Sequence, residues 1–184
     1  MTSVNVNYIG SITGRILLLS NLDICDDWSG YDDGIPNCDY DLIEGYVNYE
    51  QGEFSIHSKK ENNEFIIIFS WSSQLDIFNT ETGFIIVDGL NPSNFQQQNL
   101  SISLMKETKY HFKLEESKFI IFDASLRGSE LEHKNVGLYS VFCDEKSYGI
   151  INTQNGFYKI TKLTISSNDA EIRHAIQFDL ADKS

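Results

Sequence analysis

Short β-type runs separated by turn residues are the feature that most constrains the fold of this chain. Runs rich in Val, Ile, Phe, Tyr and Leu recur along its 184 residues, with Gly, Asn, Asp or Pro between them. No segment shows the apolar periodicity of a long amphipathic helix, and only residues 94–98 and 131–135 are compatible with a short helical turn. We therefore predict strands at residues 4–9, 15–20, 45–49, 53–58, 65–71, 84–88, 100–104, 109–114, 118–123, 138–143, 148–152, 157–165 and 171–180.

The pattern inside these runs predicts how the strands are layered. Residues 53–58 and 109–114 alternate apolar and polar side chains, as half-buried strands do. Residues 65–69 and 119–122 are continuously apolar, which is typical of central strands. Regular strand spacing with turns between favours an all-β fold, an antiparallel β-sandwich. At 184 residues the chain is long enough to bury a full core, so we expect a single compact unit over residues 1–184.

A weak internal similarity adds to this picture. Residues 6–9 followed by 14–19 resemble residues 110–114 followed by 118–122, since each pair is an alternating strand, a short turn and an apolar strand. Either two ordinary β-hairpins look alike, or the chain holds two similar β-units packed together. In the second case we expect an acidic unit at 1–105 and a second unit at 106–184.

The charge is concentrated in the first half of the chain. The formal net charge is −13, and residues 1–105 contribute 15 acids against 3 bases, whereas residues 106–184 hold 12 acids and 11 bases. Residues 23–53 contain ten acids and neither Lys nor Arg. Such a field repels nucleic acid and anionic membranes, and it attracts basic proteins and speeds their association. Solubility is the alternative interpretation of the same charge.

Aromatic residues within the acidic segment favour an interface. Tyr and Trp supply the buried anchors of many protein–protein interfaces, and here they alternate with carboxylates. The predicted partner-binding residues are Asp23, Asp26, Asp27, Trp28, Tyr31, Asp32, Asp33, Asp39, Tyr40, Asp41, Glu44 and Tyr46.

Signatures of catalysis and of metal binding are absent from the sequence. There is no GxSxG, P-loop, GxGxxG, HExxH or CxxC. Cys25, Cys38 and Cys143 are widely spaced, which favours reduced thiols over a disulfide framework or a zinc site. We expect a binding protein rather than an enzyme, with no catalytic residue, no metal and no cofactor.

One alternative function rests on the acidic segment itself. Residues 32–34 and 39–41 supply the hard oxygen ligands that calcium prefers, although they do not fit the twelve-residue EF-hand spacing. A looser calcium site in a β-sandwich loop, or a carbohydrate platform of exposed Trp and Tyr, is the competing hypothesis. Residues 1–5 lack the basic start of a signal peptide, and no apolar run approaches ~20 residues, so we expect a cytoplasmic protein without a membrane partner.

Two stretches resemble known inhibitor families. Asp27-Trp28-Ser29, Gly45-Tyr46, residues 52–55 and the apolar strand up to residue 73 resemble the competence protein J family, and the similarity continues faintly through residues 102–114. Members of that family are small cytoplasmic inhibitors of a nuclease that acts in DNA uptake. Residues 29–44 are longer and more acidic than the family pattern, and the chain continues some sixty residues beyond the matching part.

The C-terminal part is similar to a second group. Residues 119–128 and 155–161 resemble the strand, glycine turn and aromatic strand of bacterial polymorphic-toxin immunity proteins. Both resemblances imply stoichiometric inhibition of a toxic enzyme, and the partner expected from them is a basic toxin domain of the nuclease type. The acidic segment would contact a basic cleft or exosite of that toxin. A second hypothesis places the interface on the C-terminal half and leaves the acids as solubilising charge.

Overall fold

A computed structural model of the protein describes residues 2–21, 27–32, 34, 38–44, 55–60, 63–70, 72, 74–89, 97–115, 117–131, 141–143, 147–166 and 172–181. In these ranges the chain is almost entirely antiparallel β-structure, arranged as two sheets packed together. The prediction of an all-β, antiparallel sandwich is therefore confirmed. The helical elements described include a short helix α1 (Asp39–Glu44) and a 3-10 turn at Gly128–Glu130.

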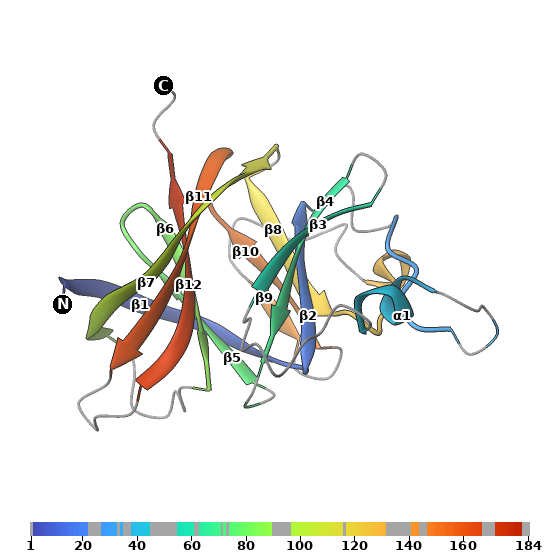
Figure 1. Ribbon diagram of the computed structural model, residues 1–184, viewed down its shortest axis with the longest axis horizontal. Coiled ribbons are helices and arrows are strands. Elements are labelled where there is room, and N and C mark those ends of the chain that lie inside the picture. The colour runs from blue at the N-terminus through green and yellow to red at the C-terminus, as the bar shows by residue number, and fades with distance from the viewer. Residues whose placement is uncertain are drawn as a thin grey trace.

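The first sheet closes on itself as a ring of six strands, seen on the left of Figure 1. Its members, in spatial order, are β1 (Thr2–Thr13), β5 (Gln74–Asn79), β6 (Gly83–Asp88), β12 (Ile172–Leu180), β11 (Gly156–Ser166) and β7 (Gln97–Leu114). Strand β1 closes the ring because its first half pairs with β7 and its second half pairs with β5, with an irregularity between Tyr8 and Gly10. Such irregularities bend a strand and increase its twist.

The second sheet lies beside the ring and is also six-stranded. Its spatial order is β3 (Ser55–Lys60), β4 (Asn63–Phe69), β2 (Ile16–Asn21), β8 (Lys118–Asp123), β10 (Tyr148–Asn152) and β9 (Val141–Cys143). Every residue of β2 is buried, and so are the central residues of β8. Both faces of this sheet are covered, which explains why its central strands are continuously apolar in the sequence.

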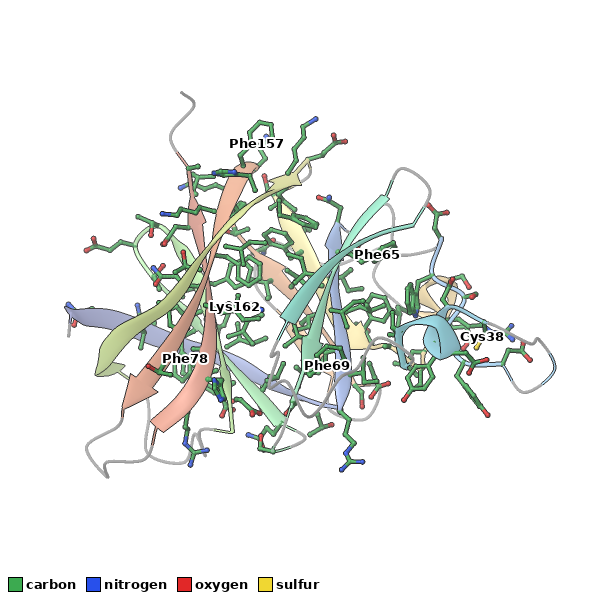
Figure 2. The ribbon with its side chains drawn as sticks, viewed as in Figure 1. Cys38, Phe65, Phe69, Phe78, Phe157 and Lys162 are labelled. Atoms are coloured by element: carbon green, nitrogen blue, oxygen red, sulfur yellow. The ribbon has the colours of Figure 1, made fainter. Side chains whose placement is uncertain are left out.

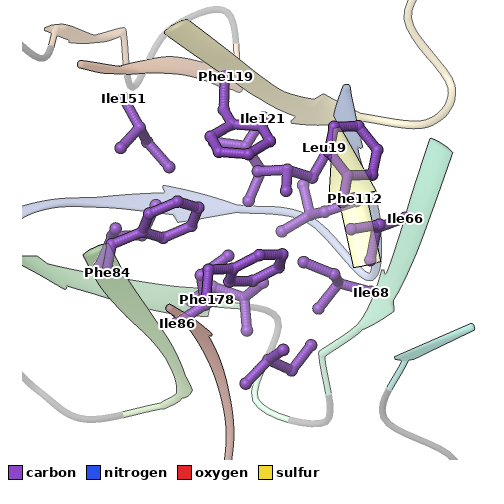
Figure 3. Close-up of a cluster of buried hydrophobic side chains, with 14 of the residues drawn as sticks. Leu19, Ile66, Ile68, Phe84, Ile86, Phe112, Phe119, Ile121, Ile151 and Phe178 are labelled. Atoms are coloured by element: carbon purple, nitrogen blue, oxygen red, sulfur yellow. The ribbon is translucent and has the colours of Figure 1, made fainter. Parts of the chain in front are cut away.

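The main core fills the space between ring and sheet. Phe84 and Phe178 from the ring stack with their centroids 4.5 Å apart, and Phe119 from β8 meets Phe84 edge-on at 5.2 Å. Figure 3 shows aliphatic side chains of β2, β4, β8 and β10 directed at the same cluster. Neighbouring residues such as Ile85 point to the opposite face of the ring strands and form a smaller cluster there. The sandwich is thus held by one aromatic core shared by both sheets.

The strand order reveals two similar halves. The ring reads β1-β5-β6 and then β12-β11-β7, and the second sheet reads β3-β4-β2 and then β8-β10-β9. Strands β1–β6 therefore occupy the same relative places as β7–β12 around a two-fold arrangement, with β2 paired to β8 at the centre of the sheet. The hairpin similarity noted in the sequence corresponds to β1–β2 and β7–β8. Each half supplies three strands to each sheet, and the division at residue 105 falls inside β7.

Several element boundaries differ from the predictions. Strand β5 and helix α1 were not predicted, and the separate strands at 100–104 and 109–114 are one strand, β7. Gln97 and Gln98 begin β7, so the helical turn expected at 94–98 is wrong at its C-terminal end. The predicted strand at 45–49 lies outside the described residues, as do residues 132–135 of the other predicted helical turn.

Candidate functional site

The acidic segment after β2 folds back over the outer face of the second sheet. Trp28 is 4 % exposed and packs against Phe65 of β4, with the ring centroids 5.4 Å apart. Its indole Nε1 donates a hydrogen bond of 2.8 Å to the carbonyl oxygen of Ala124, just after β8. Trp28 therefore anchors the segment to the sheet, and little of its side chain remains for a partner to contact.

Backbone hydrogen bonds join this segment to the connection that follows β8. The Gly128 amide donates to the Trp28 carbonyl at 3.0 Å, and the Tyr31 amide donates to the Ser125 carbonyl at 2.9 Å. Gly30 lies between them with φ of 67°, and a Cβ there would be 2.6 Å from the carbonyl of Leu126. Glycine is needed at this position because the backbone is left-handed and tightly enclosed.

We call the described residues 27–32, 34, 38–44 and 124–131 the cap. Its two parts follow β2 and β8, which are equivalent strands of the two halves, and together they cover one face of the second sheet. Figure 2 shows Cys38 in the cap, on the far side of the second sheet from the ring, with Phe65 and Phe69 on the sheet beside it. The cap is therefore a folded surface element rather than a loose acidic loop.

Asp39 is used inside the cap. Its side chain is only 8 % exposed, and its Oδ2 accepts hydrogen bonds from the Ser29 amide at 2.8 Å and the Ser29 hydroxyl at 2.7 Å. It also begins helix α1, where a carboxylate is favoured by the positive end of the helix dipole. Asp39 thus has a structural role, although the sequence predicted it as a contact residue.

The side chains that remain accessible form the outer surface of the cap. Tyr31 is 48 % exposed and meets the half-buried Tyr40 edge-to-face with ring centroids 5.7 Å apart. Asp27 and Asp41 are exposed. Two aromatic rings with carboxylates near them in the sequence combine apolar area and negative charge on a fixed backbone.

A pocket of about 310 Å³ opens in the cap at the junction of its two parts. Its lining residues are Asp27, Trp28, Ser29, Asp32, Cys38, Arg127 and Ser129. The guanidinium of Arg127 forms an ion pair with Asp32 and lies 4.0 Å from the carboxylate of Glu130. Cys38 is a free thiol, 4 % exposed. The segment without bases in sequence therefore does meet a cation in space, and that cation comes from 95 residues away.

Neither Arg127 nor Ser129 was among the predicted contact residues. The internal similarity indicates where to look, because it makes the residues after β2 and after β8 equivalent, and Arg127 also lies in the stretch 119–128 that resembles immunity proteins. Of the predicted contact residues, the structure brings Asp27, Trp28, Tyr31, Asp32, Asp39, Tyr40 and Asp41 together in the cap. Glu44 is the last residue of α1, and its side chain is not described. Asp23, Asp26, Asp33 and Tyr46 lie outside the described residues.

A second group of polar side chains lies in the ring. Asp76 of β5 is fully buried. Its Oδ1 accepts a hydrogen bond of 2.9 Å from the side-chain amide (Nε2) of Gln74, whereas its Oδ2 has no hydrogen-bond partner. Burial raises the pKa of Asp76 from 3.8 to about 6; the Gln74 hydrogen bond and the charge of Arg173 lower it, and Asp88 raises it. Asp88 itself accepts hydrogen bonds of 2.8 Å from the hydroxyls of Ser70 and Ser72.

No group of three or more His, Cys, Asp or Glu side chains in the described ranges is placed to hold a metal ion. No helix there is long and apolar enough to cross a membrane.

The fold and the site together define a two-sheet, all-β protein whose two equivalent connections form an acidic, aromatic cap with a pocket. No family model, no curated protein and no solved structure matches the chain.

Proposed function

We propose that this chain is a cytoplasmic immunity protein that binds a cationic toxin domain of the nuclease type through the outer surface of the cap. The observation that carries the proposal is the half-exposed Tyr31, which stands next to Asp32 and edge-on to Tyr40. Phe157, on ring strand β11, is the other exposed large aromatic side chain in the described ranges, and it does not belong to the cap. A surface tyrosine beside carboxylates has the composition of an interface anchor.

The rigidity of the cap supports the same proposal. Hydrogen bonds from Trp28, Tyr31 and Gly128 fix the segment to the sheet, and the left-handed Gly30 fits against Leu126. A surface that is ordered before binding loses less conformational entropy when a partner arrives. An inhibitor that must block a toxin at low concentration benefits from this pre-organisation.

Charge gives the proposed partner its chemistry. Residues 23–53 hold ten acids and no base, so the field around the cap is negative. Enzymes that bind nucleic acid carry basic clefts, and opposite fields raise association rates well above those of neutral pairs. The cap would bind such a cleft or an exosite beside it, and inhibition would follow from occlusion.

The experiment uses the nuclease-type toxin domain encoded beside this chain's gene and measures its DNA hydrolysis during titration with the purified protein. We expect stoichiometric inhibition and an association rate that falls steeply between 50 mM and 200 mM salt. Asp27→Lys should slow association about tenfold at the lower salt concentration. Glu81→Lys is the matched control, since Glu81 is exposed in the ring turn between β5 and β6 and has the same charge change.

Two results would refute the proposal. One is a gene neighbourhood without a toxin domain, or a neighbouring toxin whose hydrolysis is unaffected by the protein. The other is an equal loss of association rate for Asp27→Lys and Glu81→Lys, because net charge rather than the cap would then attract the partner. Tyr31→Ala adds an independent readout, since the loss of an aromatic anchor should raise the dissociation rate and leave the salt dependence unchanged.

A further inference from the structure

The ion pair across the pocket of the cap joins the two halves of the protein. Asp32 belongs to the connection after β2 and Arg127 to the connection after β8. The side chains are 23 % and 45 % exposed, so the pair is open to solvent at the mouth of the pocket. Arg127 is the one cation among the described lining residues, and Asp27 adds a second, exposed carboxylate.

The cap does not depend on this ion pair for its structure. The Trp28 indole, the Tyr31 amide and the Gly128 amide already fasten the two parts of the cap together by hydrogen bonds to backbone carbonyls. Exposed ion pairs contribute little to stability, because water and salt screen them. The Arg127 side chain is therefore free to leave Asp32 when a competing cation is offered, while the pocket walls stay in place.

The pocket has the chemistry of a site for one guanidinium group. Two carboxylates and the hydroxyls of Ser29 and Ser129 line the pocket and can accept hydrogen bonds, and the largely buried Trp28 adds only its small accessible part to the wall. A planar guanidinium pairs with carboxylates through two parallel hydrogen bonds, a geometry that an ammonium does not match. At about 310 Å³ the pocket is at the lower limit of ligand sites and suits a single long side chain rather than a nucleotide or an oligosaccharide.

We propose that this pocket receives an arginine side chain of the cationic partner, and that Arg127, in the pocket wall, engages the Asp32 carboxylate that this arginine would pair with until the partner binds. The inference rests on the proposed function, because it assumes a cationic protein partner, and it adds the identity of one contact and an internal competitor. It predicts an unusual direction for the change in binding affinity. Removing Arg127, a residue of the binding pocket, strengthens binding instead of weakening it.

The test measures binding of a fluorescein-labelled hexa-arginine peptide by anisotropy at 50 mM salt. Arg127→Gln should bind the peptide about two- to fivefold more tightly than the wild type, which is the range expected when an exposed ion pair no longer competes. Asp32→Asn should bind it several-fold more weakly. Lys113→Gln is the matched control, because Lys113 is an exposed cation paired to Glu115 at 2.7 Å on β7 and its loss changes the net charge equally. It should leave the affinity close to that of the wild type.

Peptide chemistry provides the second comparison. Hexa-lysine should bind more weakly than hexa-arginine, and hexa-citrulline, which keeps the shape without the charge, should not bind. Arg127→Lys retains the charge but not the planar fork, so its affinity for hexa-arginine should lie between those of the wild type and Arg127→Gln. Thermal melts of all variants check that the cap is folded, and Arg127→Lys keeps the test decisive if Arg127→Gln is unstable.

The inference is overturned if Arg127→Gln binds hexa-arginine no more tightly than Lys113→Gln, or if hexa-lysine binds as well as hexa-arginine. Its failure is distinguishable from failure of the proposed function. A protein that inhibits the toxin but shows neither peptide effect retains its function and loses the arginine assignment. A protein that shows both peptide effects but leaves the toxin active retains the pocket assignment and loses the immunity role.

Discussion

Asp76 offers the sharpest test of the energetics of the ring. Its carboxylate is fully buried on β5, Oδ2 has no hydrogen-bond partner, and burial raises its pKa from 3.8 to about 6. The group therefore binds its proton more tightly in the folded chain than in the unfolded chain. Its stabilising contribution is fully present below pH 3.8 and is lost as the pH rises through about 6. At pH 7 the folded protein carries the whole cost of a buried, ionised carboxylate.

The size of that cost follows from the pKa shift. A shift of about two units corresponds to about 3 kcal/mol at pH 7. Asp76→Asn replaces the carboxylate with a neutral group of the same shape, so the charge-burial cost disappears. Below pH 4 the carboxyl of folded wild-type Asp76 is protonated and neutral too. Its OH group, and the NH2 group of the Asp76→Asn side chain, would then each lack a hydrogen-bond partner. We therefore expect Asp76→Asn to gain only about 0.5 kcal/mol at pH 4, where the unfolded chain has begun to ionise, and about 3 kcal/mol at pH 7.

The assay is urea unfolding followed by tryptophan fluorescence at pH 4, 5.5 and 7, with the free energy of unfolding extrapolated at a common slope. Asp41→Asn is the matched control, because Asp41 is exposed in α1 and its substitution removes the same charge. We expect its effect to stay within about 0.5 kcal/mol at every pH. An Asp76→Asn variant that is less stable than the wild type at pH 7, or that matches Asp41→Asn, would refute the reasoning.

Three further substitutions test the cap and the core by thermal and urea unfolding. Gly30→Ala should destabilise the protein by about 1–3 kcal/mol, since φ is 67° and the new Cβ would meet the Leu126 carbonyl at 2.6 Å; an unchanged midpoint would contradict that geometry. Trp28→Phe should cost about 1–3 kcal/mol because the buried Ala124 carbonyl loses its donor, and a neutral effect would mean that water replaces the indole. Phe119→Ala should cost about 3–5 kcal/mol through the cavity left in the shared core, and a loss below 1 kcal/mol would show that the core collapses around it.

The sequence predicted the fold well wherever burial follows a simple pattern. Residues 65–69 of β4 and 119–122 of β8 are continuously apolar because the core covers one face and the cap covers much of the other, so their pattern is unambiguous. Strand β5 was missed because Asp76 interrupts its apolar pattern at a fully buried position. Local pattern cannot indicate that a carboxylate is buried by the rest of the ring.

Strand β7 illustrates a different limit. Its pairing with β11 shifts register between Lys159 and Thr161 and again between Lys162 and Leu163, so β7 carries extra residues at both points. The first shift adds two residues to β7 and the second adds one, and an odd number of extra residues reverses a strand's alternation, so no single period-two pattern runs through β7. Helix α1 was missed for the opposite reason, since a six-residue helix is too short to show a period.

The candidate site was predictable in location but not in composition. Acids and aromatics marked the connection after β2, and the structure adds what sequence distance concealed, namely the burial of Trp28 and Asp39 and the approach of Arg127. The exposed face of the cap is consequently smaller and better ordered than a segment with ten acids suggests. Tyr31 is the aromatic residue of that face with the most exposed side chain.

The two halves have the same strand order and differ in the connections that form the cap. The halves share one arrangement of strands, so the frame itself cannot distinguish one half from the other. Their equivalent connections do differ: residues 22–54 hold ten acids and no base, whereas residues 124–140 hold two acids and two bases, one of them Arg127. A difference of that size between equivalent segments is not required by the sheets, which are covered by apolar contacts from both. The charge asymmetry is therefore a property of the surface rather than of the frame, and Arg127 pairs with one of its carboxylates, that of Asp32.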